Sequence, residues 1–339
     1  MTNETANQNS SDILQEKTNG FTNTIKKLMR SNVSILVILF VLVVGFGGIT
    51  NPSFLRFQNI QTIMRACGII GITGLGATVV LLVGEMDISM GAVMSFTTLL
   101  GGMFIGKLPG QATPIILTLI FGLLTGSFIG LIITKLKITA IMATLGAMNL
   151  FSGLAYLLTS GLNILLYNAP LYKKMGTGLW FGIPISFVIF LGLALVLHIV
   201  LTYTAFGKKL YFTGANSKAA WLSGVNTSLI KTASFAFSGM CSALAGMFLA
   251  GQTNQLIATL GVGYELSGIA IAVLGGTAIG GGRGSVVGTL LGALTYQSLL
   301  NLLALSGLGT YVEQVLRGAL LIIIVVAYAT LNKKQHALR

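Results

Sequence analysis

Long apolar runs follow one another along almost the whole chain beyond residue 30. A bilayer core about 30 Å thick is crossed by roughly 20 helical residues, and lipid offers no partner for unpaired backbone groups, so such runs predict membrane-spanning helices. Charged residues make up only 8% of the 339 positions, whereas soluble domains carry about 25%. The pattern argues against a soluble globular enzyme and predicts ten spans, at residues 31–50, 60–83, 89–106, 113–134, 139–158, 183–203, 232–250, 264–280, 285–305 and 314–331.

The distribution of lysine and arginine predicts the orientation of these spans. Fourteen of the 20 basic residues fall in loops on the same side as the N-terminus, four fall on the other side, and Arg65 and Arg317 lie within spans. Because basic loops remain in the cytoplasm, both termini are expected there. The net charge of +13 is better explained by this rule than by nucleic-acid binding, since no basic stripe with interleaved aromatic residues occurs.

The fold class predicted is therefore an all-α integral membrane protein in a lipid bilayer, with one transmembrane domain over residues 31–331. A polar cytoplasmic tail at residues 1–30 is expected to be disordered, and residues 332–339 form a second cytoplasmic tail. The first apolar run lacks a small-residue cleavage signature and is interpreted as a retained span. Two connections are long: residues 159–182 face outward, and residues 204–231 face the cytoplasm.

Two glycine ladders suggest an internal repeat. Glycines 122, 126 and 130 are matched by glycines 284, 288 and 292 at a constant offset of 162 residues. In the predicted topology the two ladders run in opposite directions, as in an inverted repeat of spans two to five and seven to ten. Small residues at a spacing of four also let helices approach closely, so the ladders are equally consistent with packing alone.

The cytoplasmic loop contains a pattern typical of a short amphipathic helix. Gly214 can break the chain, and Asn216 or the following serine can cap a helix. Ala219, Leu222 and Val225 then recur at helical spacing. Such a helix can lay its apolar face into the groove of a partner protein or lie on the lipid surface, and the spacing alone does not decide between them.

A second segment, at residues 84–91, places two carboxylates between apolar runs. Glu85 and Asp87 are flanked by glycines, which suggests a broken or re-entrant turn. Carboxylates at membrane depth are costly and mark either a pathway or a structural pair. Asp87 can instead cap the following helix, with Ser89 in its first turn. Both interpretations stay open for these three residues.

A third segment, at residues 261–266, leads into an apolar helix and then a glycine-rich turn. Glu265, next to Tyr264, is expected to favour the helix N-terminus electrostatically. Arg283, in the turn, is either an inside anchor or the partner of a carboxylate. Glu313 and Arg317 are four residues apart and are expected to form a local ion pair.

Signals for catalysis are weak. Residues 101–107 match the start of a phosphate-binding loop, but Leu108 stands where a Mg²⁺-binding hydroxyl is needed. His198 and His336 are isolated, so neither a metal site nor acid–base catalysis is expected. The two cysteines, at positions 67 and 241, have apolar surroundings typical of packing thiols. No catalytic, cofactor-binding or metal-binding residue is assigned.

Taken together, the three segments resemble membrane permease subunits of bacterial ATP-binding-cassette importers for ribose, galactose, xylose and similar monosaccharides, with autoinducer-2 importer permeases as close relatives. Residues 84–91 resemble the family pattern G-x-D-L-S-V-G, and residues 263–270 match G-Y-E-L-x-x-I-A. Residues 273–276 and 281–284 match V-L-G-G and G-G-x-G, and residues 214–225 resemble G-N-x-x-A-A-x-x-x-G-I with one extra residue, Ala215. Glu85 departs from the family, which more often has a small residue there; Ile88, Met90 and Val225 are conservative departures.

The resemblance implies a permease subunit in the bacterial inner membrane that is not itself an enzyme. Two permease subunits, identical or related, would form the pathway for a monosaccharide of ribose type or a related sugar signal, and an extracytoplasmic binding protein would deliver it. Two cytoplasmic ATPases would bind ATP and Mg²⁺ and dock on the 204–231 loop through Gly214, Asn216, Ala219, Leu222, Gly224 and Val225.

Glu85 leaves the exact substrate open, and it also supports an alternative function. A proton-coupled secondary transporter of a small polar solute would need a titrating carboxylate within the membrane, such as Glu85. A membrane-embedded transferase is a more distant alternative, since the constellation of histidine, aspartate or metal that it would need is missing.

Overall fold

The computed structural model describes residues 32–167 and 169–309 and, beyond these, residues 311–312, 314–316, 318–319, 322–323 and 326. Most of the expected tenth span, both tails, and the expected Glu313–Arg317 pair lie outside the described residues. The helices are α2 (Asn32–Thr50), α3 (Phe57–Leu82), α4 (Met90–Gly102), α5 (Ala112–Leu136), α6 (Ala140–Thr159), α7 (Pro170–Thr177), α8 (Ile185–Tyr203), α9 (Ala205–Ala215), α10 (Ser217–Leu222), α11 (Thr227–Thr253), α12 (Tyr264–Leu274) and α13 (Val286–Leu305).

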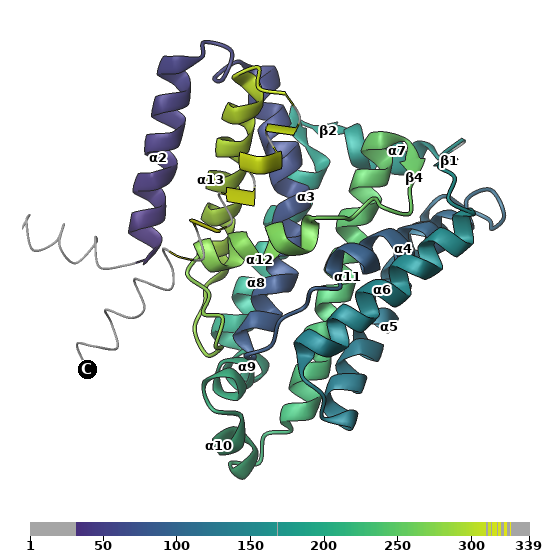
Figure 1. Ribbon diagram of the computed structural model, residues 1–339, viewed down its shortest axis with the longest axis vertical. Coiled ribbons are helices and arrows are strands. Elements are labelled where there is room, and N and C mark those ends of the chain that lie inside the picture. Colours follow the sequence, from purple (N-terminus) through teal and green to yellow (C-terminus); the bar gives the residue numbers. More distant parts are fainter. Residues whose placement is uncertain are drawn as a thin grey trace, which may run out of the picture.

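Four two-residue strands form two small antiparallel pairs at one end of the helical bundle (Figure 1). Strand β1 (Ile164–Leu165) pairs with β4 (Gln255–Leu256), and β2 (Leu179–Trp180) pairs with β3 (Ile183–Pro184). Helices α9 and α10 lie at the opposite end of the bundle. The two ends are called the strand end and the α9–α10 end below.

Seven described helices are long and apolar enough to cross a membrane: α2, α3, α5, α6, α8, α11 and α13. They match seven of the predicted runs. The predicted spans at 89–106 and 264–280 are shorter than expected, because α4 has 13 residues and α12 has 11. At 1.5 Å per residue these helices extend about 20 and 16 Å, which is less than the apolar core of a bilayer.

Each short helix is bounded by backbone that cannot continue it. A turn follows α4 at residues 103–107, and α12 is followed by Gly276, whose φ of 85° is left-handed. The non-helical segment 83–89 precedes α4, and the glycine-rich turn 275–285 follows α12. The break before α4 was expected from the carboxylates and glycines of residues 84–91, whereas the early ends of α4 and α12 were not, because the residues that follow these two helices are apolar or glycine.

Helices α3 and α11 form the centre of the bundle. In the most apolar stretch of α3, 89% of the residues are buried, and in that of α11, 67% are buried. In the corresponding stretches of α2, α6 and α8, fewer than one-third of the residues are buried. Figure 1 shows α2 beside α13 on one flank and α5 and α6 on the other. The outer helices therefore present large apolar surfaces, as lipid-facing helices do, around a packed centre.

Glycines allow the closest helix contacts. A Cβ on Gly126 would collide with the carbonyl oxygen of Phe235, so α5 packs directly on the backbone of α11. Gly288 and Gly292 of α13 pack instead on the end of α12. The expectation of close small-residue packing is confirmed. The two ladders meet different partner helices, so they do not by themselves mark a repeat.

Replacing Gly126 by valine is expected to destabilise the folded protein by about 1–3 kcal/mol, because the new side chain would be forced into the backbone of α11. The matched control is Gly146→Val in α6, where a Cβ meets nothing within 4 Å. Thermal unfolding of the purified protein in detergent, followed by size-exclusion chromatography, measures the difference. Equal midpoints for both variants would contradict this account of the α5–α11 contact.

Candidate functional site

The three segments singled out in the sequence lie together in the bundle. The N-terminal ends of α4 and α12 meet, because a Cβ on Gly91 would collide with Glu265 and with the carbonyl of Gly261. The hydroxyl of Ser95 donates to the Gly91 carbonyl at 3.2 Å and accepts the Gly261 N–H at 2.9 Å. Both carboxylate oxygens of Glu265 lie 3.1 Å from the N–H of Gly263, which precedes α12. The expected position of Glu265 at a helix N-terminus is confirmed.

Asp87 is buried, with 3% of its surface exposed. Its Oδ1 accepts the backbone N–H of Ser89 at 3.0 Å and the Ser89 hydroxyl at 2.6 Å, and its Oδ2 accepts the hydroxyl of Ser238 of α11 at 2.7 Å. These donors satisfy the carboxylate in the way that a buried charge requires. The arrangement favours a structural role, but the predicted cap is wrong: Ser89 is itself the N-cap residue of α4, and Asp87 accepts bonds from Ser89 instead of capping the helix.

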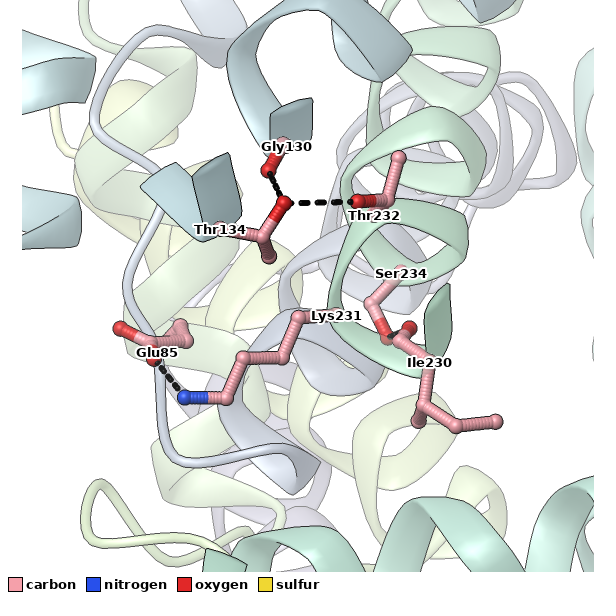
Figure 2. Close-up of polar contacts among 7 residues, drawn as sticks. All are labelled: Glu85, Gly130, Thr134, Ile230, Lys231, Thr232 and Ser234. Atoms are coloured by element: carbon pink, nitrogen blue, oxygen red, sulfur yellow. Dashed lines mark hydrogen bonds and ion pairs between the residues drawn. The ribbon is translucent and has the colours of Figure 1, made fainter. Parts of the chain in front are cut away.

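Glu85 forms an ion pair with Lys231 of α11, with Oε1 and Nζ 2.5 Å apart (Figure 2). The two residues are 146 positions apart in the chain. The sequence predicts Lys231 only as a basic residue of the cytoplasmic loop, not as the partner of Glu85. A signal was present, since a single glutamate follows one apolar run and a single lysine begins another, but the pairing itself requires the fold.

The predicted amphipathic helix is present in altered form. Gly214 does not break the chain; it lies inside α9, where its missing side chain lets α9 pack on the Leu82 carbonyl at the end of α3. The break falls at Asn216, whose φ of −159° is extended. Asn216 Oδ1 accepts the N–H of Ala219 at 2.9 Å, which confirms the predicted cap.

Helix α10 ends at Leu222, so Val225 does not continue its face as predicted. Gly224 has a φ of 82°, and the Val225 N–H bonds to the Ala220 carbonyl while the Gly224 N–H bonds to the Trp221 carbonyl. This is the Schellman arrangement, in which a left-handed glycine closes a helix. Ala220 is the buried residue of α10, whereas Trp221 and Leu222 are 65% and 70% exposed.

Helix α9 also fixes the glycine-rich turn that follows α12. The Tyr211 hydroxyl donates to the Gly284 carbonyl at 3.0 Å, and burial raises the pKa of Tyr211, so the donor stays protonated. The Gly282 N–H donates to the Leu82 carbonyl at 3.0 Å. The end of α3, α9 and this turn therefore form one hydrogen-bonded unit at the α9–α10 end.

The remaining predicted residues have modest surroundings. Arg283 is exposed on the turn, and it forms no ion pair with any carboxylate of the described residues. Tyr264 is partly buried against the main apolar core. Cys67 and Cys241 are buried free thiols. Within the described part of the chain, no three histidine, cysteine, aspartate or glutamate side chains gather to hold a metal ion.

An open groove of about 360 Å³ lies beside Glu85. It is lined by residues 84–86, by residues 137–139 of the α5–α6 connection with the first two residues of α6, and by Ile279. Polar and charged groups therefore border a cavity at the same end of the bundle as α9.

Comparison with known proteins identifies the family. Residues 59–325 match the family described as the permease component of the branched-chain amino acid transport system. The chain is 36% identical to the ribose import permease protein RbsC of Bacillus subtilis over 301 residues, which cover 88% of this chain and 92% of the relative. It is 31% identical to the autoinducer 2 import system permease protein LsrC of Photorhabdus laumondii over 302 residues, 88% of this chain and 90% of the relative.

A solved structure, described as an inward-facing conformation of a metal-chelate type ABC transporter, has a similar fold. The TM-score is 0.57, the sequence identity is 17%, and the match covers 87% of this chain and 98% of the other. At this identity the likeness concerns the fold alone. Because the family match covers most of the chain and relatives above 30% identity extend over nearly its full length, the protein belongs to this family of transport permeases.

Proposed function

We propose that the protein is the membrane-spanning permease subunit of an ATP-binding-cassette importer and forms the pathway for a monosaccharide of ribose type or a related sugar signal. The observation that carries this proposal is the pair of short helices α9 and α10, which projects from one end of an apolar bundle (Figure 1). The names of the relatives, ribose and autoinducer-2 import permeases, support the class of solute.

Exposed groups on α10 suit a protein partner. Trp221 and Leu222 are largely exposed side by side, and Lys218 lies on the same short helix. A helix with exposed apolar side chains can fill a groove on another protein. We propose that a cytoplasmic ATPase, which binds ATP and Mg²⁺, docks here, so that the hydrolytic chemistry belongs to that partner and not to this chain.

The same assignment places the α9–α10 end in the cytoplasm of a bacterial cell whose inner membrane holds the bundle. Ten spans with both termini inside fit the basic-residue count, with the tenth at residues 314–331. An inverted repeat is supported by the order of helix lengths: α3, α4 and α5 run long, short, long, and α11, α12 and α13 repeat that order. A second permease subunit would complete the pathway, and a solute-binding protein would dock at the strand end.

Coupling would use alternating access, in which ATP binding by the partner shifts the population between two arrangements. Displacement of α10 would move α9, which packs on the end of α3 at Gly214 and is hydrogen-bonded to the turn after α12 through Tyr211. The proton-coupled alternative is less well supported, because Glu85 is already paired with Lys231 and Asp87 already accepts three hydrogen bonds.

Uptake of labelled ribose into vesicles that contain the protein, its ATPase and its binding protein is expected to require ATP. Dissipating the proton gradient should leave the rate unchanged, because hydrolysis supplies the energy. Vesicles lacking only the ATPase are the control. Uptake that continues without the ATPase and stops when the proton gradient collapses would establish a secondary transporter instead.

Replacing Gly224 by valine is expected to weaken ATPase docking about tenfold or more. A β-branched residue at a left-handed φ costs roughly 1–2 kcal/mol, so the turn that orients α10 would rearrange. Quantitative co-purification of the ATPase measures docking, and Gly153→Val in α6, where a Cβ has open space, is the matched control. A complex of unchanged affinity would remove this turn from the docking site.

A further inference from the structure

Helix α11 holds the link between α3 and α4 at two points. Ser238 donates to Asp87, and Lys231 binds Glu85. Ser238 is seven positions after Lys231 in the chain. Seven positions are close to two helical turns, so both side chains leave the same face of α11. Residues 83–89 therefore lie along one face of this helix.

The two contacts differ in their exposure to water. Asp87 and Ser238 are both buried, and a buried hydrogen-bonded carboxylate is costly to separate from its donors. The side chains of Glu85 and Lys231 are 17% and 22% exposed. Water screens a partly exposed ion pair and lowers the free energy needed to separate it. The outer contact can therefore open while the inner one remains.

Space for such an opening exists beside Glu85. The groove of about 360 Å³ is lined by Glu85, by Met86 and by residues 137–141. Because Glu85 itself lines this groove, its carboxylate has unfilled space beside it when it leaves Lys231.

The chain connects this ion pair directly to α10. Lys231 is the fifth residue of α11, and only residues 223–226 separate α10 from α11. These four residues are held by the Schellman bonds at Gly224 and by Asn226, whose Oδ1 accepts the Leu229 N–H at 3.0 Å. Because the connection is short and hydrogen-bonded, we expect a displacement of α10 to reach the start of α11.

The next residue of α11 contacts a different element. Thr232 lies 3.3 Å from the hydroxyl of Thr134 of α5, which also bonds to the Gly130 carbonyl at 2.8 Å. Figure 2 shows Lys231 extending toward the α3–α4 link while Thr232 points toward α5. A movement at the start of α11 would therefore act on the α3–α4 link through Lys231 and on α5 through Thr232.

We infer that Glu85 and Lys231 are positioning residues for transport, and that their ion pair holds the resting arrangement until a displaced α10 draws Lys231 away. The inference rests on the proposed function, since it needs an ATPase at α10. It assigns Glu85 to control of the conformational equilibrium instead of to the pore lining.

The test uses the full complex of the protein with its ATPase in vesicles, without binding protein or solute. Glu85→Gln and Lys231→Met are each expected to raise basal ATP hydrolysis about two- to fivefold, because the resting arrangement is no longer favoured. The exchanged double variant E85K/K231E should return the rate toward that of the unaltered protein. Lys135→Met, which removes an exposed lysine of α5 without an ion pair among the described residues, is the matched control.

Thermal unfolding of the same preparations separates positioning from stability. A purely structural pair would lower the unfolding temperature and reduce hydrolysis, whereas the inference requires hydrolysis to rise. Unchanged hydrolysis in both single variants would overturn it, as would failure of the exchanged pair to restore the rate at an unchanged unfolding temperature. Absence of any hydrolysis by the unaltered complex would instead contradict the proposed function.

Discussion

The structure depends on satisfying non-helical backbone inside an apolar bundle. A membrane-spanning chain has no water to bond its exposed N–H and C=O groups, so a break in a helix must be repaired by protein. Here the break at residues 83–89 is repaired by Asp87, which bonds Ser89 locally and Ser238 across to α11. The carbonyl of Leu82, at the end of α3, accepts from Gly282. Each short helix is therefore fixed by contacts from the other half of the chain.

Glycine makes these contacts possible by bringing backbones together. Gly91 allows the start of α4 to touch residues 261–265, and Gly214 allows α9 to reach the end of α3. In both places a side chain would occupy the space that the neighbouring backbone fills. The abundance of glycine, 44 residues in all, reflects packing at contacts of this kind more than chain flexibility, which explains how a chain so rich in glycine forms a tightly packed centre.

The sequence predicted the long helices well because their signal is local. Apolar runs flanked by polar residues identify α3, α5, α6, α8 and α11, and Asn216 was recognised as a cap from its type and position. The fold of the two short helices was beyond this reasoning. The residues after each of them are apolar or glycine, so hydropathy does not indicate where α4 or α12 stops, and only tertiary contacts decide it.

The candidate site was predicted in part for the same reason. The carboxylates at 85, 87 and 265 stood out as costly groups between apolar runs. What they bind was hidden, because Lys231 and Ser238 lie about 150 residues away from Glu85 and Asp87. Glycine favours turns, so the sequence predicts a helix break at Gly214. In the structure Gly214 lies inside α9, and its lack of a side chain lets α9 approach the end of α3.

The meeting of α4 and α12 gives Glu265 a physical explanation that neither helix provides alone. The N-terminus of a helix carries a partial positive charge, and here two such ends face each other across Gly91 and Gly261. Two like partial charges in an apolar bundle repel, and the repulsion is stronger than in water because the surroundings screen little. The carboxylate of Glu265 lies against both ends, bonded to the Gly263 N–H and touching the position of Gly91. Its negative charge offsets the repulsion, so a charge that would be costly on one isolated helix stabilises the junction of two.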